Sequence, residues 1–449
     1  MVVFLLLVVA GCGVAAWLGL RQGPVPTLVI ESERPAVGPA ARVTARLTEP
    51  RRGLGKVRLE LQQGERVEVL AERSFPRPGP LGGARTGETV LEAQIGKLHQ
   101  AWLQEGEVVV RAVADRAAGF LRSPAPAVAE TRLPVRLHPP RLGVLSKQHY
   151  VRQGGVGAVV VQTEADGVRS GVRAGVREFR SFPLPGGSPG QAFVIYGVAW
   201  EGATAADVRV FAEDAAGNRA EQAFIDLFKP VVRRPGLIEI DDAFLQRVVP
   251  PIVAQTPGLD ASGTLLDQYL RINGALRRTV LAQIGEACTK SEERFLWNGP
   301  FLQMPNSARK AGFAETRTYR YQGRAVDTQT HLGLDLASTS HADVPAANRG
   351  RVILAGWLGL YGNAVLLDHG FGVATLYGHL SEVAVKPGDT VEKGQSVGRS
   401  GTTGLAGGDH LHLEVFVQGL SVDPAEWLDA HWIQDNLASK LPLPAPTTR

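Results

Sequence analysis

Alternating hydrophobic and polar positions dominate the first half of the chain. Lys56–Glu72, KVRLELQQGERVEVLAE, consists of two alternating runs around Gln-Gly-Glu, which predicts a β-hairpin. Short runs of this kind recur from about Pro26 to Lys229, separated by turns rich in glycine and proline. We therefore expect β structure throughout this part of the chain.

Two segments of this β region resemble each other at the spacing of one domain. Ala101–Trp102 recurs as Ala199–Trp200, and VRAVADRAAG at 110–119 recurs as VRVFAEDAAG at 208–217, with an offset of 98 residues in both cases. A period near 100 residues with short strands is typical of immunoglobulin-like sandwiches. We expect two such domains, at residues 25–137 and 138–232, which act as spacers or as binding modules.

The periodicity changes to that of helices after Pro235. Apolar residues of IDDAFLQRVV (240–249) and GTLLDQYLRINGALRRTVLAQIGEAC (263–288) follow helical spacing, although Asn273-Gly274 is a helix-breaking pair. Prolines and glycines predict a loop between the two segments, PPIVAQTPGLDASG. We expect residues 233–300 to form a helical linker, and a cap over a neighbouring groove is the alternative.

The remaining sequence predicts one more β domain and a tail. Residues 301–435 return to short strands with glycines between them, which indicates an antiparallel β domain. The tail, 436–449, is rich in proline and is expected to be disordered. The expected fold is thus mainly β and multidomain: two immunoglobulin-like β-sandwiches, a helical linker and a C-terminal antiparallel β domain.

Residues 1–24 form a separate apolar segment. The stretch MVVFLLLVVAGCGVAAWLGLR has no charged side chain before Arg21, and about 20 apolar residues suffice to span a bilayer. We favour an uncleaved membrane anchor. The alternative is a lipoprotein signal, because VAGC at Val9–Cys12 would place a lipid on Cys12. Both interpretations place the bulk of the chain in the cell envelope, outside the cytoplasm, in the periplasm.

Charge and cysteine content narrow the possible partners only slightly. The formal net charge is +4 over 449 residues, and no run of Lys and Arg indicates a nucleic-acid partner. A mildly basic chain suits an anionic polymer. Cys12 and Cys288 lie in unrelated segments, so we expect no disulfide between them.

Most histidines lie in the last third of the chain, which makes this part the candidate for a metal site or a catalytic site. Seven of ten lie after residue 330. In THLGLDLAS (330–338), His331 and Asp335 share the strand face opposite three leucines. Four residues of straight strand span about 13 Å, too far for two ligands of one zinc ion. The chain must therefore bend between them, and Gly333 permits a bend.

A second histidine cluster lies in GGDHLHLEVFV (407–417). His410, His412 and Glu414 alternate with apolar residues and share one strand face, about 6–7 Å apart at neighbouring positions. One histidine can hold a metal ion while the other stands beside the bound water. TLYGHL (375–380) adds His379. Two His and one Asp leave a fourth tetrahedral position for water, the arrangement of a catalytic zinc site.

These motifs carry a family resemblance. Residues 313–428 resemble the lysostaphin-type (LytM-like) zinc metalloendopeptidases, which cut peptide cross-links in bacterial cell walls, through HLGLDLA, the GNAVLLDHG–YGHL segment and DHLHLEV. The resemblance implies that His331, Asp335 and His412 bind one zinc ion. It also implies that His379 and His410 act on water and on the transition state.

The implied function is that of a membrane-anchored zinc metalloendopeptidase acting on peptidoglycan, with the inner membrane bound through residues 1–24. Glu414 is expected to orient a zinc ligand, and a solvent-facing charge is the alternative. Asp409, where the family often has a small residue or proline, is expected to change the charge near His410. His341 is expected to be a loop residue, and a place in the groove wall is the alternative. His369 is expected to be a turn residue, and His431 is expected to be structural.

Two further interpretations compete with the active enzyme. One is a non-catalytic cell-wall-binding protein or amidase activator built on the same domain; such relatives typically lack zinc ligands, and all five positions are filled here. The other is a latent enzyme whose groove is covered by residues 235–300.

Overall fold

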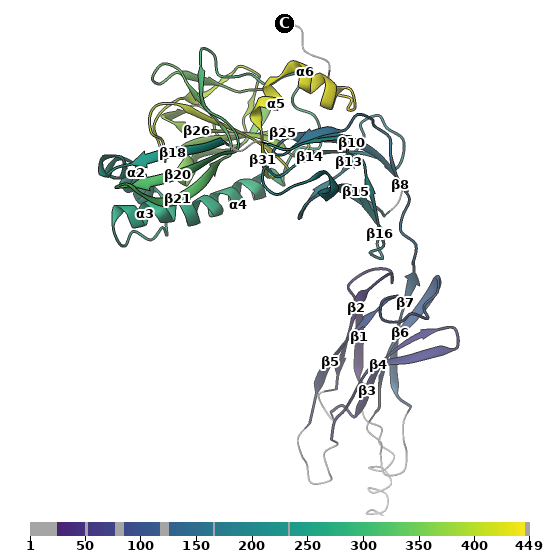
Figure 1. The fold of residues 1–449 in the computed structure, drawn as a ribbon. Coiled ribbons are helices and arrows are strands. Elements are labelled where there is room, and N and C mark those ends of the chain that lie inside the picture. Colours follow the sequence, from purple (N-terminus) through teal and green to yellow (C-terminus); the bar gives the residue numbers. More distant parts are fainter. Residues whose placement is uncertain are drawn as a thin grey trace, which may run out of the picture. The chain divides into compact units, whose positions relative to one another are not determined.

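A computed structural model of the chain describes residues 25–49, 53–76, 85–116, 125–164, 167–231 and 234–444. The chain divides into two units, residues 1–140 with 213–220, and residues 141–212 with 221–449 (Figure 1). The expected anchor at residues 1–24, including Cys12, lies outside the described residues. No helix within the described ranges is both long and apolar enough to cross a bilayer.

The first unit contains two antiparallel sheets, with strand orders β1-β2-β5 and β4-β3-β6-β7. Val43, Leu59 and Val110 lie fully buried in its core. The predicted hairpin is confirmed, because β3 and β4 pair antiparallel around Gly64, whose φ of 59° suits glycine. The strands are β1 (Thr27–Ser32), β2 (Ala41–Thr48), β3 (Lys56–Gln63), β4 (Arg66–Ser74), β5 (Glu88–Ile95), β6 (Gly106–Ala114) and β7 (Ala127–Val135).

Residues 141–229 form further sheets, β13-β14-β10-β8, β12-β11-β15-β16 and the parallel pair β17-β9. Their strands are β8 (Leu142–Val144), β9 (Tyr150–Arg152), β10 (Val156–Thr163), β11 (Arg169–Ala174), β12 (Arg177–Arg180), β13 (Phe182–Pro183), β14 (Gln191–Gly197), β15 (Val208–Glu213), β16 (Arg219–Ala223) and β17 (Leu227–Lys229). The mainly β expectation is confirmed, whereas the immunoglobulin-like class and the domain boundaries stay predictions.

The region expected to be a helical linker begins with a strand. β18 (Arg234–Ile240) pairs in parallel with β20 (Glu315–Tyr321), so this region joins the sheet β18-β20-β21. Three helices follow: α2 (Asp242–Gln255), α3 (Leu265–Arg271) and α4 (Arg277–Cys288). Helices α3 and α4 lie along β20 and β21 (Figure 1).

One local prediction in this region is wrong, and one possibility that the sequence left open is decided. The loop predicted from Pro250 begins only after Gln255, because Pro250 and Pro251 lie inside α2. The apolar face of α2 continues past them to the fully buried Ile252, and this burial offsets the lost backbone hydrogen bonds. The Asn273-Gly274 pair does not break the second helix either: a π-helical turn, Ile272–Leu276, joins α3 to α4.

The C-terminal domain is built on an eight-stranded antiparallel sheet of order β19-β22-β30-β26-β25-β24-β28, with β31 paired to β30. Its strands are β19 (Ala308–Ala311), β22 (Leu334–Ala337), β24 (Gly350–Trp357), β25 (Asn363–Gly370), β26 (Val373–Leu380), β28 (Thr390–Val391), β30 (Leu411–Val417) and β31 (Leu420–Val422). β21 (Arg324–His331) belongs to the neighbouring sheet with β18 and β20, and a smaller sheet contains β23 (Asp343–Pro345), β29 (Ser396–Arg399) and β27 (Glu382–Val383).

One apolar core joins the second β region to the C-terminal domain. Phe371 stands edge-on to Phe182 and Phe193, with ring centroids 5.0 and 4.9 Å apart. The same core includes Leu437 and Leu441, both buried. The disordered tail predicted from residue 436 is therefore wrong through Leu441, because these leucines follow α5 (Pro424–Leu428) and α6 (Ala430–Ile433) into the core.

A charged contact reinforces this junction. Arg152 of β9 donates from Nε to Glu426 Oε1 at 2.8 Å and from Nη2 to Asp423. The second oxygen of Glu426 accepts the Val156 backbone N–H at 2.8 Å. Glu426 and Asp423 are largely buried, with side-chain exposures of 7% and 13%. Arg152 therefore neutralises two carboxylates that would otherwise lie unpaired at the base of α5.

We expect Arg152→Met to lower the free energy of unfolding by about 2–4 kcal/mol, because it leaves Glu426 and Asp423 buried without a counter-charge. The measurement is denaturant unfolding of the purified chain. Arg349→Met is the matched control: it breaks the exposed Arg349–Glu392 pair (3.0 Å) and should cost less than about 1 kcal/mol. Equal effects of the two substitutions would contradict this account.

Candidate metal centre

Three side chains that are distant in sequence converge on one point. Nε2 of His331 lies 2.8 Å from Oδ1 of Asp335 and 3.1 Å from Nδ1 of His412, and this Nδ1 lies 3.0 Å from the same Oδ1. All three side chains are at least mostly buried, with exposures of 6–13%. One ion could contact all three donor atoms at once.

The backbone brings these residues together by changing sheets. β21 ends at His331, and after two residues the chain enters the large sheet at Leu334, so the required bend lies between the two ligands. In β22, Asp335 lies directly across from His412 of β30. Gly333 makes this approach possible, because a Cβ atom there would lie 2.6 Å from Cε1 of His412.

The hydrogen bonds around the two histidines identify which nitrogen of each ring faces the centre when the ring is neutral. Nδ1 of His331 lies 2.8 Å from the Gly312 carbonyl, which can only accept, so this nitrogen donates. Nε2 of His412 donates in the same way to Glu414 Oε2 at 3.3 Å. With both outer N–H groups committed, two nitrogen lone pairs and a carboxylate oxygen face one another. Such a set repels itself unless a proton or a cation lies between its members, which fits a divalent metal.

Glu414 is a buried carboxylate that accepts a hydrogen bond from the His412 ring. Its side chain is fully buried, and it accepts hydrogen bonds from Tyr361 Oη at 2.8 Å and Ser421 Oγ at 2.5 Å. The alternation along β30 places Glu414 beside His412, as expected from the sequence. No sequence signal identified Tyr361 or Ser421, because their positions depend on how neighbouring strands pair.

Arg317 of β20 is a further residue that the sequence did not reveal. Its Nη2 lies 3.0 Å from Oδ2 of Asp335 and 3.4 Å from Glu315 Oε2. The guanidinium occupies the outer oxygen of Asp335, so Oδ1 is left to face the histidines. Although burial opposes ionisation, the close contacts with His331, His410 and His412 hold the pKa of Asp335 well below its usual range, because the ionised carboxylate favours a proton on these rings.

His379 and His410 stand beside the three converging residues. Their ring centroids are 4.9 Å apart, and the ring of His379 lies 5.9 Å from that of His412. Both rings donate from Nδ1 at 2.8 Å, His379 to the Thr403 carbonyl and His410 to that of Gly408. His379 has a φ of 62°, a left-handed conformation rarely adopted by residues other than glycine. Burial, together with the nearby His410 and His412, lowers the pKa of His379 well below 6.5.

Other polar residues singled out in the sequence lie away from this point. The Asp409 carboxylate accepts from Ser400 Oγ at 2.6 Å and from the His341 backbone N–H at 3.0 Å, so it is engaged by these loops and not by the His410 ring. His341 is exposed and does not line the cavity described below. His369 is a fully buried strand residue rather than a turn residue, bonded to Arg349 O and Thr375 Oγ1.

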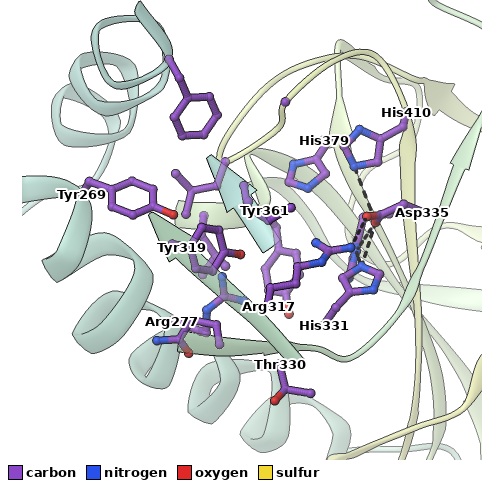
Figure 2. Close-up of a pocket in the computed structure, with 17 residues that line it drawn as sticks. Tyr269, Arg277, Arg317, Tyr319, Thr330, His331, Asp335, Tyr361, His379 and His410 are labelled. Atoms are coloured by element: carbon purple, nitrogen blue, oxygen red, sulfur yellow. Dashed lines mark hydrogen bonds and ion pairs between the residues drawn. The ribbon is translucent and has the colours of Figure 1, made fainter. Parts of the chain in front are cut away.

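A cavity of about 180 Å³ opens on the candidate centre. All five predicted site residues line it: His331, Asp335, His379, His410 and His412. Its opposite wall includes Phe244 of α2, Tyr269 of α3 and Arg277 of α4. Figure 2 shows Tyr269 and Arg277 across the cavity from the histidines. The helices thus form part of the cavity wall, as the cap interpretation of residues 233–300 requires.

In the metal-free protein, we expect the His412 imidazole to titrate at about pH 9. Burial opposes its charge, but the hydrogen bonds that the protonated ring donates to Asp335 and Glu414 raise its pKa to about 9. Because this pKa is above the ordinary 6.5, His412 contributes stability that is fully present below pH 6.5 and lost as the pH rises through about 9.

The measurement is an NMR titration of the ring carbons. Glu414→Gln should lower the midpoint, since it removes one of the two carboxylates, and saturating zinc should abolish the titration by replacing the proton. A midpoint near 6.5 in the metal-free wild type would contradict this assignment.

Comparison with known proteins places this region in a family. Residues 329–424 match the model of peptidase family M23. A 94-residue stretch, 21% of the chain, is 40% identical to the DD-carboxypeptidase/endopeptidase Mpg of Neisseria meningitidis, over 22% of that protein. The peptidoglycan DD-endopeptidase ShyB of Vibrio cholerae is 35% identical over 113 residues, 25% of this chain and 26% of ShyB.

A relative of another kind matches about as well. The murein hydrolase activator EnvC of Escherichia coli is 38% identical over 110 residues, 24% of this chain and 26% of EnvC. The chain spans about a quarter of the length of each of these three relatives. The resemblance inferred from the histidine motifs is confirmed, and the C-terminal part of this chain carries a peptidase family M23 domain.

Proposed function

We propose that the chain is a membrane-anchored zinc metalloendopeptidase that hydrolyses peptide cross-links of bacterial peptidoglycan. One observation carries the proposal: two histidine nitrogens and one carboxylate oxygen converge on one point beside two further histidines. Two relatives named as peptidoglycan or DD-specific peptidases support the substrate class. In this proposal, residues 1–24 anchor the chain and residues 25–232 act as spacers that carry the domain to the periplasmic wall.

His331, Asp335 and His412 would hold the zinc ion. Zinc in such a site supplies a Lewis acid that polarises a carbonyl and makes water acidic enough to ionise near neutral pH. The residues of this chain prepare the site for it: Gly312 and Glu414 hold the imidazole rings, and Arg317 holds the carboxylate. The burial of these side chains strengthens the interactions between their charges.

His379 is assigned as the general base. Its Nδ1–H is committed to the Thr403 carbonyl, so the neutral ring presents Nε2 as a proton acceptor. Its lowered pKa keeps the ring neutral at pH 7. His410, which places Nε2 3.6 Å from Asp335 Oδ1 at the edge of the cavity, is assigned to hydrogen bonding with the reacting substrate oxygen.

The second candidate function is that of a hydrolase activator, which the similarity to EnvC favours. An activator needs neither the metal nor a base. The complete set of five polar residues, each held by specific hydrogen bonds, favours the enzyme. The two experiments below separate these functions.

We expect purified protein to bind one zinc ion per chain. His331→Ala, Asp335→Ala and His412→Ala should each lose most of it, because each removes one of three ligands. Metal content is measured by mass spectrometry after dialysis. His431→Ala is the control, since this exposed histidine lies outside the cavity and should keep the full content. Stoichiometric zinc in the ligand variants would contradict the site.

We expect the full chain to release new amino groups from purified peptidoglycan. His379→Ala should lower the rate by about 10²–10⁴-fold while it keeps the zinc, because it removes the proton acceptor and no ligand. His431→Ala should retain the wild-type rate. A wild-type protein that binds zinc but cuts no wall peptide, and that stimulates an added amidase, would favour the activator.

A further inference from the structure

We propose that Arg277 forms a carboxylate-binding subsite in the cavity beside the candidate metal centre, and that this subsite selects substrates by a free carboxylate. The inference rests on the proposed function, because the ligand is a group of the peptide that would be cut. Arg277 begins α4 and lines the same cavity as His331, Asp335 and His379 (Figure 2).

The guanidinium of Arg277 is held in place but not neutralised. Nε donates to the Asn273 carbonyl at 3.1 Å, and Nη2 donates to Asn273 Oδ1 at 2.5 Å. Asn273 is fully buried, and its own amide donates to Asp327 Oδ2 at 2.7 Å. These are the hydrogen bonds of the Arg277 side chain within the described part of the chain, and they leave Nη1 free to donate.

The other arginine of the cavity differs in this respect. Arg317 forms ion pairs with Asp335 and Glu315, so its charge is balanced by the protein itself. Arg277 has no acidic partner within ion-pair distance among the described residues. A half-buried cation without a counter-ion has lost part of its hydration, and the hydrogen bonds of an incoming anion compensate for that loss.

The aromatic side chains that line the cavity near Arg277 favour an ion pair with a ligand carboxylate. Tyr269 and Tyr319 meet edge-to-face, with ring centroids 6.1 Å apart, and Phe244 packs on Tyr269 at the same centroid distance. All three rings line the cavity. Aromatic walls lower the local dielectric and strengthen a hydrogen-bonded ion pair between a guanidinium and a carboxylate.

The backbone that carries Arg277 is also unusual. The π-helical turn Ile272–Leu276 contains Asn273 and ends immediately before Arg277. Such turns are rare and occur frequently at functional sites. Here the turn places the buried amide that fixes the guanidinium.

The ligand chemistry is that of a carboxylate on a short peptide. A cavity of about 180 Å³ accommodates a small group of a peptide. Two carboxylates of a cross-linked peptide meet this description: the α-carboxylate at the end of a peptide, and the carboxylate carried by a diamino acid at the cross-link. The experiment distinguishes them.

The test measures affinity for three synthetic cross-linked peptides on the full, zinc-loaded chain. One peptide has both carboxylates free, one has the α-carboxylate amidated, and one has the diamino-acid carboxylate amidated. The His379→Ala background prevents cleavage during calorimetry. Amidation of one of the two carboxylates should weaken binding by about 10-fold or more.

Substitutions in the same background identify the residue responsible. Arg277→Gln should weaken binding of the peptide with both carboxylates free. Its affinity should then equal that of the amidated peptide that binds weakly to the protein with Arg277. Arg277→Lys should keep part of the difference in affinity between these two peptides, because lysine retains the positive charge. Arg278→Gln is the matched control, because Arg278 is the exposed neighbour and does not line the cavity.

Each contrary outcome is decisive. Equal affinity for all three peptides, or binding of none, overturns the subsite, and this comparison needs no variant of Arg277 that must fold. Wall cleavage by the wild type without carboxylate dependence leaves the proposed function intact and rejects the subsite. Carboxylate-dependent binding through Arg277 without any cleavage supports the subsite and rejects the enzyme.

Discussion

The rest of the domain depends on the convergence of three electron-pair donors on one point. Two imidazole nitrogens and a carboxylate oxygen lie 2.8–3.1 Å apart. Such atoms repel one another, and each buried group loses water as well. The arrangement persists only because other contacts hold every donor from its far side, so that a cation becomes the group that completes it.

Those outer contacts come from elements that are otherwise unrelated. The Gly312 carbonyl precedes β20, and Arg317 lies within β20. Tyr361 ends the 3-10 helix Gly359–Tyr361 before β25, and Ser421 belongs to β31. Each is positioned by sheet pairing or by the core. Metal ligands need this kind of support because a small rotation of an imidazole would turn its lone pair away from the ion.

The helices and the second β region also support the site. Strand β18 joins the sheet that carries Arg317 and His331, and α3 and α4 add Tyr269 and Arg277 to the cavity. The contact between Phe182 and Phe371 and the ion pairs of Arg152 join the second β region to the domain that holds the site. Residues of α2, α3 and α4 therefore form part of the cavity wall, and the second β region shares a core with the domain that holds the site.

The sequence alone determined the residues that converge. Alternation along 411–417 places His412 and Glu414 on one strand face, and the separation of His331 from Asp335 requires a bend that Gly333 permits. These features are local, because strand periodicity and backbone freedom act within a few residues.

Only the tertiary structure decided the rest. Arg317 and Arg277 are ordinary arginines in the sequence, and one becomes balanced and the other unbalanced through strand pairing and helix packing. Pro250 and Pro251 remain helical for the same reason: burial of a helix face against distant residues outweighs a local preference. Contacts between distant segments are not encoded in local patterns, so they exist only in the folded chain.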